Sequence, residues 1–228
     1  MPEDRVQPSM AEQAYRRIEE MIVTRALSPG AMISEKMLMD ELGAGRTPVR
    51  EALQRLRLEG YIEVHPSRGI QVSTIDVFRQ FELLEVRRPL EDVMVRLASQ
   101  RATASERARM LSLADEIMSA AAVRDRGAFL KANRDVHQTL AQASRNVILA
   151  NSISTLHGLS RRFWYSYIED GDVFEAAAKL HGLTLRSVSA GEETEAAQHA
   201  REFLNFLEDL SREALNQRID LNRQRPTG

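Results

Sequence analysis

Arg50 and Gln54 lie one helical turn apart in the stretch from residue 43 to residue 57, and both side-chain types can recognise DNA bases. Arg can make two hydrogen bonds to a guanine edge, and Gln can make two to an adenine edge. The apolar residues of the same stretch fall at i, i+3, i+4 and i+7, which is the spacing of one helix face. They are Val49, Ala52, Leu53 and Leu56. The stretch predicts a helix that packs through this apolar face and presents Arg50 and Gln54 to a major groove.

The start of this helix is expected at Thr47. The Thr47 hydroxyl can cap a helix N-terminus, and Pro48 suits the first helical position, where no backbone N–H is missed. Arg46 then lies just ahead of the cap, and Arg57 continues the polar face. The N-terminal turn of the helix is therefore expected to be basic.

The segment before the helix predicts the first part of a helix-turn-helix. An amphipathic helix ends near residues 28–30, and a short helix runs from a cap at Ser34 to Leu42. Residues 43–45, Gly-Ala-Gly, supply the tight turn into the second helix of the motif.

The segment after the helix predicts a β-hairpin. Gly60 ends the helix, and residues 61–64 and 70–73 alternate between apolar and polar residues at the strand period. The hairpin forms a wing beside the helix-turn-helix, with Arg68 near its tip.

Composition alone does not indicate a nucleic-acid binder. The 228 residues have a formal net charge of −2, and residues 1–75 contain ten Lys and Arg against eleven Asp and Glu. Residues 43–71 hold five Arg against three Glu, a local net charge of +2. The indication of DNA is therefore positional. The alternative interpretation is a solvated face on a small helical domain.

The length allows two domains. No apolar run is long enough to span a bilayer, and the polar start argues against a signal peptide, so we expect a cytoplasmic protein with no membrane partner. The absence of cysteine excludes disulfides and thiolate sites. We expect flexible ends at residues 1–9 and 222–228, and a winged helix-turn-helix domain over residues 10–75.

Residues 76–228 predict an all-α bundle of about six helices, so the fold class is mostly α. The expected helices are Val77 to Arg101, Ser105 to Arg124, Arg126 to Ser144, Val147 to Ser166, Val173 to Ala190 and Glu192 to about Leu221. Thr103 with Glu106 predicts a capping box, and Asp125, Asn146 and Asp172 are expected caps of the next three helices. A domain of this size can enclose a pocket between helices.

Residues of about 10 to 73 resemble the winged helix-turn-helix domain of the GntR family of bacterial transcription regulators. The resemblance is carried by LSPGAMISEKMLMDELGAGRTPVREALQRLRLEGYIEVHPSRGIQV. It implies that Arg46, Thr47, Arg50, Arg68 and Gly69 approach DNA. Lys36 stands where the family often has arginine, so it keeps a phosphate contact as a point charge.

The C-terminal part resembles the ligand-binding domain of the FadR-type subfamily, also called FCD-like. The resemblance is carried by FELLEVRRPLEDVMVRLASQRAT, FLKANRDVHQTLAQASRN and KLHGLTLRSVSAGEETEAA. Many members bind a divalent metal such as zinc through an Asp or Asn, a His one turn later and two further His residues. The resemblance implies Asn133, His137 and His181 as ligands, and the first two share a helix face at i and i+4.

The fourth ligand position departs from that pattern. The expected residue is Phe203, which cannot bind a metal, and His199 lies one turn earlier on the same face. Asn133 in place of a carboxylate also removes charge, so metal affinity is expected to be low or absent. Water or effector oxygens would have to complete the coordination.

Several of these residues also have a purely structural interpretation. His65, His157 and His199 are more simply explained as hydrogen-bonded histidines. Arg87 is expected either to clamp an effector carboxylate or to form an ion pair with Glu85 or Asp76. The aromatic residues near Trp164 either wall a pocket or belong to the core.

The sequence therefore predicts a homodimeric transcription regulator, a repressor, that binds a two-fold symmetric double-stranded DNA operator. Its C-terminal domain dimerises and binds a small organic acid, with Arg87, Asn133, His137 and His181 as expected effector contacts. One alternative is a DNA-binding protein without ligand sensing. Another is a metal-dependent enzyme, but no HExxH motif or carboxylate cluster supplies a general base, so we expect no enzyme.

Overall fold

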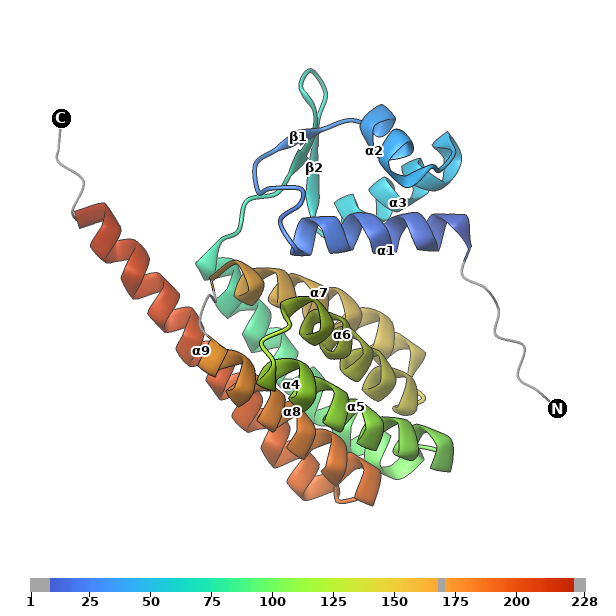
Figure 1. The fold of residues 1–228 in the computed structure, drawn as a ribbon, viewed down its shortest axis with the longest axis vertical. Helices are drawn as coiled ribbons and strands as arrows, with labels where there is room; N and C mark the ends of the chain where they lie inside the picture. Colours follow the sequence, from blue (N-terminus) through green and yellow to red (C-terminus); the bar gives the residue numbers. More distant parts are fainter. Residues whose placement is uncertain (1–8, 168–170, 224–228) are drawn as a thin grey trace. The chain divides into compact units, whose positions relative to one another are not determined.

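The computed structural model describes residues 9–167 and 171–223, drawn in colour in Figure 1. The chain forms two compact units, Met1–Ile75 and Asp76–Gly228. The flexibility expected at the chain ends concerns mainly residues 1–8 and 224–228, which lie outside the described residues.

The N-terminal unit contains helices α1 (Met10–Val23), α2 (Glu35–Leu42) and α3 (Arg46–Leu58). The cap at Ser34 is confirmed, because its hydroxyl accepts a hydrogen bond from the Met37 N–H at 3.1 Å. Gly43 ends α2 with φ of 60°, a left-handed conformation that side chains rarely adopt. The chain therefore turns sharply from α2 into α3.

The expected cap of α3 at Thr47 is wrong. The helix begins at Arg46, its N-cap is Gly45 in an extended conformation, and no side chain caps it. Thr47 lies inside the first turn, because the helix begins directly after the glycine turn and not at the Thr-Pro pair. Within the residues that the structure describes, no side-chain cap hydrogen bond satisfies the first N–H groups of α3.

The predicted hairpin is present as β2 (Ile62–His65) and β3 (Gly69–Val72), paired antiparallel with Ile62 opposite Val72. A third strand, β1 (Met32–Ile33), pairs with the other edge of β3, so the strand order is β1-β3-β2. The sequence did not predict β1, because a two-residue strand has no measurable period. β1 ties the segment before α2 to the wing.

The C-terminal unit is helical throughout its described residues. Its helices are α4 (Val77–Arg101), α5 (Ala104–Ala122), α6 (Arg126–Ala143), α7 (Val147–Tyr167), α8 (Gly171–Ala190) and α9 (Glu193–Arg223). The capping box at Thr103 and the caps at Asp125 and Asn146 are confirmed. The expected cap at Asp172 is wrong, because α8 already begins at Gly171 and Asp172 lies in its first turn.

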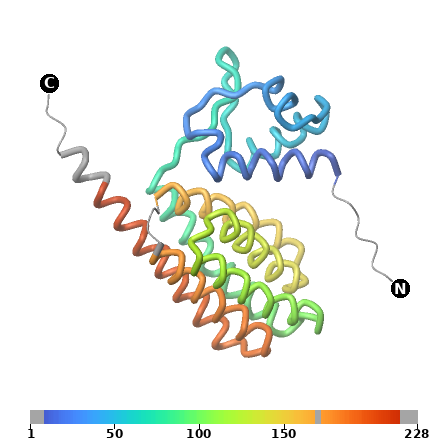
Figure 2. Tube along the Cα trace, in the orientation of Figure 1, coloured from blue at the N-terminus to red at the C-terminus, as the bar shows by residue number. Residues whose placement is uncertain are grey.

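Helix α4 is central to this unit, since it contacts α6, α7, α8 and α9. The last two helices run side by side as a long hairpin, as Figure 2 shows. Polar residues on the inner face of α4 therefore meet side chains from several other helices. None of the helices in the described ranges combines the length and the apolarity that a membrane crossing needs.

Candidate functional site

The residues expected to approach DNA are all exposed on the N-terminal unit. They are Lys36, Arg46, Thr47, Arg50, Gln54, Arg68 and Gly69. The apolar stripe of α3 is buried, with Val49 and Leu56 fully so. Helix α3 thus packs through one face and leaves its basic and amide side chains in solvent.

Arg50 has a partner that sequence analysis missed. Its Nε donates to Glu35 Oε1 at 3.0 Å, which joins α3 to the first turn of α2. The Arg50 side chain is still 64 % exposed. An exposed pair of this kind is weak, so it orients Arg50 without holding it away from another acceptor.

Arg55 plays a structural part. Its guanidinium bonds Glu59 at 2.9 Å and Glu12 at 2.8 Å, and it stacks 3.6 Å from the centroid of the Tyr15 ring. Burial and the Glu59 carboxylate raise the pKa of Tyr15 above its usual value. Arg55 therefore fastens α1 to α3, although it contributed to the local positive charge found in the sequence.

The wing carries Arg68 at its tip, between the two hairpin strands. Gly69 has φ of +94°, so a side chain there would strain the backbone. His65 Nε2 lies 3.1 Å from Gln71 Oε1, in agreement with the structural interpretation of this histidine.

A buried polar cluster lies inside the C-terminal unit. Its members are Arg87 and Glu91 on α4, Asn133 and His137 on α6, His157 and Ser160 on α7, and His181 on α8, and each is less than 5 % exposed. We refer to these residues as the polar cluster. The tertiary fold brings together all four expected effector contacts and adds Glu91, His157 and Ser160.

Arg87 pairs with Glu91, one turn along α4, rather than with Glu85 or Asp76. The Arg87 Nε to Glu91 Oε2 distance is 3.2 Å, and Arg87 Nη1 donates to Ser160 Oγ at 3.2 Å. Its second terminal nitrogen, Nη2, is buried without a hydrogen-bond partner among the described residues. The two N–H groups of Arg87 Nη2 are thus available to another acceptor.

Glu91 is an ionised carboxylate. Burial by itself raises the pKa of Glu91, but the Arg87 guanidinium and His157 lower it to well below its usual range. His157 Nε2 lies 2.9 Å from Glu91 Oε2, so this histidine is hydrogen-bonded and buried. Sequence analysis treated His157 as a core residue and gave no signal that it would meet Glu91.

The other two histidines are held by the amide of Asn133 and by ring contacts. The Asn133 Nδ2 to His181 Nε2 distance is 2.9 Å, and the His137 ring stacks on His157 with centroids 3.8 Å apart. Asn133 Oδ1 and His137 Nδ1 have no hydrogen-bond partner among the described residues. His137 Nδ1 lies 3.9 Å from Glu91 Oε1, beyond hydrogen-bond distance.

All three imidazoles are neutral at pH 7. Burial lowers the pKa of His137 well below its usual value, and the positive charges of Arg87 and Arg161 act in the same direction. Burial, then Arg87, lower the pKa of His181 to about 3. Burial also lowers the pKa of His157, against the opposing effect of Glu91.

Phe203 on α9 fills the position where a fourth ligand was expected. Its ring centroid lies 4.1 Å from that of His181, and the Arg87 Cζ lies 5.5 Å from the ring. His199 does not join the cluster, because its Nδ1 lies 3.1 Å from Ser187 Oγ on α8. The two residues on α9 therefore add no metal donor beside His181.

A different group of side chains has metal-ligand geometry. Glu91, His137 and His157 each offer a ligand atom, and these atoms lie within 4.8 Å of one another. These three residues could hold a metal ion. The sequence did not single out this group, since its members come from three helices with no common spacing.

A small cavity adjoins the polar cluster at Asn133 and His181. Its volume is about 10 Å³, room for roughly one water molecule. Its wall includes four Phe and one Trp, and Phe129, Trp164 and Phe174 contact one another edge to face. Trp164 is 7 % exposed and belongs to this aromatic core.

The chain matches two protein families and several named regulators. The family described as bacterial regulatory proteins, gntR family, matches residues 10–72, and the FCD domain matches residues 82–206. The Nta operon transcriptional regulator of Aminobacter aminovorans is 33% identical over 146 residues, which cover 64% of this chain and 68% of that protein. The regulator McbR of Escherichia coli K12 is 27% identical over 194 residues, 84% of this chain and 87% of that one.

Two solved structures share the fold. Escherichia coli McbR/YncC superposes with a TM-score of 0.79 at 23% identity, covering 92% of this chain and 100% of that chain. A GntR transcriptional regulator from Rhodococcus sp. RHA1 gives a TM-score of 0.70 at 22% identity, covering 92% and 99%. The matched families and relatives are transcriptional regulators rather than enzymes.

Proposed function

Because this chain belongs to the GntR family of bacterial regulatory proteins and carries an FCD domain, we propose that it is a homodimeric repressor released from its operator by a small organic acid. The main observation in support of the proposal is that α3 exposes a polar face, while its opposite face is buried in the core. The operator is double-stranded DNA with two half-sites related by a dyad.

The N-terminal unit recognises the operator through three kinds of contact. Arg50 and Gln54 contact base edges from the exposed face of α3. The uncapped N–H groups at the start of α3, together with Arg46 and Thr47, bind a phosphate at the positive end of the helix dipole. Lys36 and the wing residues Arg68 and Gly69 contact the backbone on either side.

Charge in the polar cluster favours an anionic effector. The positive charges of Arg87 and Arg161 both lower the pKa of His137, whereas the carboxylate of Glu91 is already paired with Arg87. Arg87 Nη2 and, in the tautomer protonated there, His137 Nδ1 are donors that find no acceptor within the described part of the chain. A carboxylate can accept hydrogen bonds from both, and Asn133 and His181 complete the contact surface.

The donors Asn133, His137 and His181 do not fit a resident divalent metal. They carry no negative charge, the Asn133 amide already contacts His181 at 2.9 Å, and the fourth position holds Phe203. The group Glu91, His137 and His157 has a suitable donor set, but Arg87 already neutralises its carboxylate. We therefore propose an effector site that works without zinc or another divalent ion.

Release of the operator follows if the effector binds two conformations of the C-terminal unit with different affinities. The cavity beside the polar cluster has room for about one water molecule, so an effector larger than water binds only when side chains of α8 or α9 move. A ligand that binds the moved state more tightly shifts the dimer toward it. If that state misplaces the two N-terminal units, operator affinity falls by the same coupling free energy.

A second candidate function is a DNA-binding regulator without an effector. The observation in its favour is the same small cavity, closed by aromatic side chains and Phe203. A ligand-dependent melting screen with small carboxylates distinguishes the two functions, since only the first predicts stabilisation.

Selection of bound sites from a random double-stranded DNA pool tests the main proposal. We expect an inverted repeat, and we expect Arg50→Ala to weaken binding to it by about 1–3 kcal/mol and to relax its base preference. Arg109→Ala, an exposed change in the C-terminal unit, is the matched control. Equal operator binding by Arg50→Ala and the parent at fixed salt would contradict the assignment of α3.

A further inference from the structure

The small cavity beside the polar cluster is lined by helices α6 to α9 and is polar at one place only. Of its lining residues in the described part of the chain, Asn133 and His181 are polar and the other nine are apolar. The two polar side chains contact each other at 2.9 Å, so they form a single polar end. A hydroxyl or carboxylate elsewhere on a ligand would lose its water here without gaining a hydrogen bond.

The polar end adjoins buried groups that lack hydrogen-bond partners. Arg87 Nη2, His137 Nδ1 and Asn133 Oδ1 have none among the described residues. Phe203 lines the cavity and also lies against the polar cluster, with its ring centroid 4.1 Å from that of His181 and 5.5 Å from Arg87 Cζ. Turning the Asn133 amide over would aim its NH₂ group at the same place. A carboxylate at this end can therefore accept hydrogen bonds from several buried donors.

The apolar part of the cavity reaches the surface between α8 and α9. Val173 and Ala177 lie one turn apart on α8, and Phe206 and Leu210 lie one turn apart on α9. All four line the cavity and are half-buried, whereas the two polar lining residues are buried. A ligand that enters between these helices must have its polar group at the inner end and an apolar body toward the surface.

The rings of the wall favour a flat, aromatic body. The Phe129 ring meets Trp164 at 90° and Phe174 at 84°, with centroids 5.5 Å and 5.0 Å apart. Aromatic rings prefer such edge-to-face contacts or offset stacks, and a ligand ring can form either with these side chains. Because the cavity has room for about one water molecule, binding requires it to widen. A planar ring needs less widening than a saturated ring with the same number of carbon atoms.

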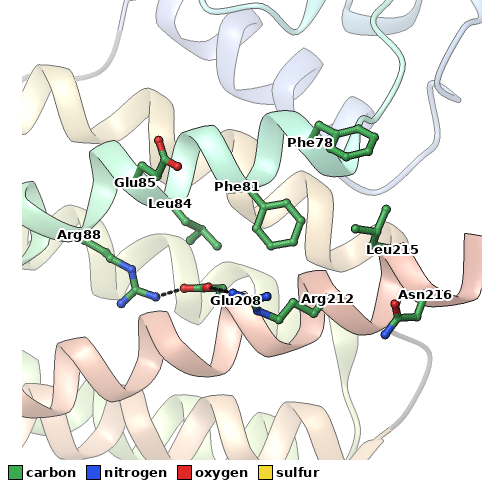
Figure 3. Close-up of a pocket in the computed structure, with 9 residues that line it drawn as sticks. All are labelled: Phe78, Phe81, Leu84, Glu85, Arg88, Glu208, Arg212, Leu215 and Asn216. Atoms are coloured by element: carbon green, nitrogen blue, oxygen red, sulfur yellow. Dashed lines mark hydrogen bonds and ion pairs between the residues drawn. The ribbon is translucent and has the colours of Figure 1, made fainter.

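A larger groove in the same unit lacks these features. It has a volume of about 540 Å³ and lies between α4 and α9, as Figure 3 shows. Its two positive residues, Arg88 and Arg212, both pair with Glu208. None of the buried unpaired groups found in the described residues lines it. Size alone therefore does not identify the site of an anionic ligand.

We infer that the effector is an aromatic monocarboxylate, whose carboxylate bonds Arg87 and His137 and whose ring occupies the cavity between α8 and α9. This inference rests on the proposed function for its regulatory meaning, and it adds the chemical class of the effector. Dicarboxylates and sugar acids do not belong to this class, because their further polar groups would face the apolar wall.

Trp164 provides a direct readout, since it lines the cavity and is the single tryptophan of the sequence. The full chain, without DNA, is titrated with benzoate, phenylacetate and 3-phenylpropanoate, which differ in the spacing between ring and carboxylate. We expect a saturable change in Trp164 fluorescence with at least one of them. The matched amide and the cyclohexyl analogue of the best binder should bind about tenfold more weakly or worse, since the first lacks the charge and the second the planar ring. Succinate should not compete.

A pair of alanine substitutions on α8 locates the bound ring. Ala177→Phe fills the mouth of the cavity and should weaken binding of the best acid about tenfold or more. Ala176→Phe is the matched control, because Ala176 is also half-buried on α8 but does not line the cavity. Thermal melts check that both variants fold, and the ligand series on the parent does not depend on either.

Three results would overturn the inference: no saturable change with any of the three acids, equal binding of the amide or the cyclohexyl analogue, or equal loss of binding in both alanine variants. Failure of the proposed function gives a different result. An aromatic acid that binds the parent but does not release the selected operator would support the ligand class and contradict release. Stabilisation by succinate alone would support an acid effector and overturn the aromatic class.

Discussion

At the scale of single residues, burial determines the chemistry of the polar cluster. His65 and His199 are half-buried, whereas His137, His157 and His181 are buried, and burial lowers the pKa of each of these three. Arg87 is 1% exposed, and the Glu91 carboxylate, 3.2 Å from its Nε, is the charge that pairs with it in the core. The cluster is therefore sensitive to pH and to loss of any single partner.

The histidines should make stability fall as the pH is lowered. The folded-state pKa of His181 is about 3, below the value near 6.5 expected in the unfolded chain. Between these values the unfolded state binds a proton that the native state does not, so stability rises with pH across this window and is lost as pH falls through it. Each fully shifted histidine contributes a slope of up to about 1.4 kcal/mol per pH unit.

Urea unfolding of His181→Gln at pH 7, 6, 5 and 4 measures this contribution. We expect a shallower loss of stability than in the parent, because Gln cannot take up the proton. His65→Gln, on the wing, serves as the control for a half-buried histidine. A pH slope that is unchanged in His181→Gln would show that this histidine does not stay neutral in the native protein.

Metal analysis of variants tests the role of Phe203. We expect the purified parent to hold little or no divalent metal, and Phe203→His to raise metal occupancy by adding an imidazole beside His181. His199→Ala should leave occupancy unchanged, because His199 bonds Ser187. A fully loaded parent that is emptied by His199→Ala would reverse this interpretation.

The role of the polar cluster in effector binding can be tested independently of metal. His137→Ala or His181→Ala should reduce release of the operator by the effector while leaving effector-free DNA affinity nearly intact. An unchanged effector response in both variants would remove the polar cluster from the mechanism.

At the scale of elements, capping fixes where the helices of the C-terminal unit begin. The Thr103 hydroxyl accepts from the Glu106 N–H at 3.3 Å, and the Glu106 carboxylate accepts from the Thr103 N–H at 2.8 Å. Each bond satisfies a donor that the helix itself cannot pair. α5 in turn packs along α8, so its start affects the helix that carries His181.

Thr103→Ala should therefore destabilise the protein by about 1 kcal/mol, within the range of about 0.5–2 kcal/mol for lost N-caps. Chemical denaturation of the full chain measures the change. Ser154→Ala, an exposed position inside α7, should change stability by much less. Equal effects of the two substitutions would mean that the box at Thr103 contributes nothing beyond helix propensity.

At the scale of the whole molecule, the part that matches the gntR family and the FCD domain lie in separate compact units that divide at Asp76. Because the net charge is −2, we expect operator affinity to come from the placement of a few basic residues and not from overall charge. In the proposed dimer each N-terminal unit contacts one half-site, so we expect high affinity to require two copies of this unit.

Residues 1–75 alone should consequently be monomeric and bind the full operator weakly. In a dimer, binding of one N-terminal unit raises the effective concentration of the other at the second half-site. Removal of the C-terminal unit removes this effect. Footprinting and sedimentation at matched concentrations measure the two effects. Parent-like affinity from a monomeric residue 1–75 fragment would refute the dimeric mode of binding.

The sequence by itself determined the helices and strands that have local signals. The amphipathic period of α3, the caps at Ser34 and Thr103 and the bounds of α4 depend on residues within a few positions of each other, and they are visible without the fold. The N-cap of α3 lies at Gly45, two residues before the expected Thr47, because the glycine turn and the Thr-Pro pair are both local signals for a helix start.

Only the tertiary structure decided which distant side chains meet. Glu91 contacts His157 across 66 positions of sequence, and Arg87 reaches Ser160 across 73. No period links such residues, since their contact depends on the packing of α4 against α7. The same holds for β1, which exists only because β3 lies beside it, and for the neutral state of the buried histidines, which follows from the removal of water by several helices at once.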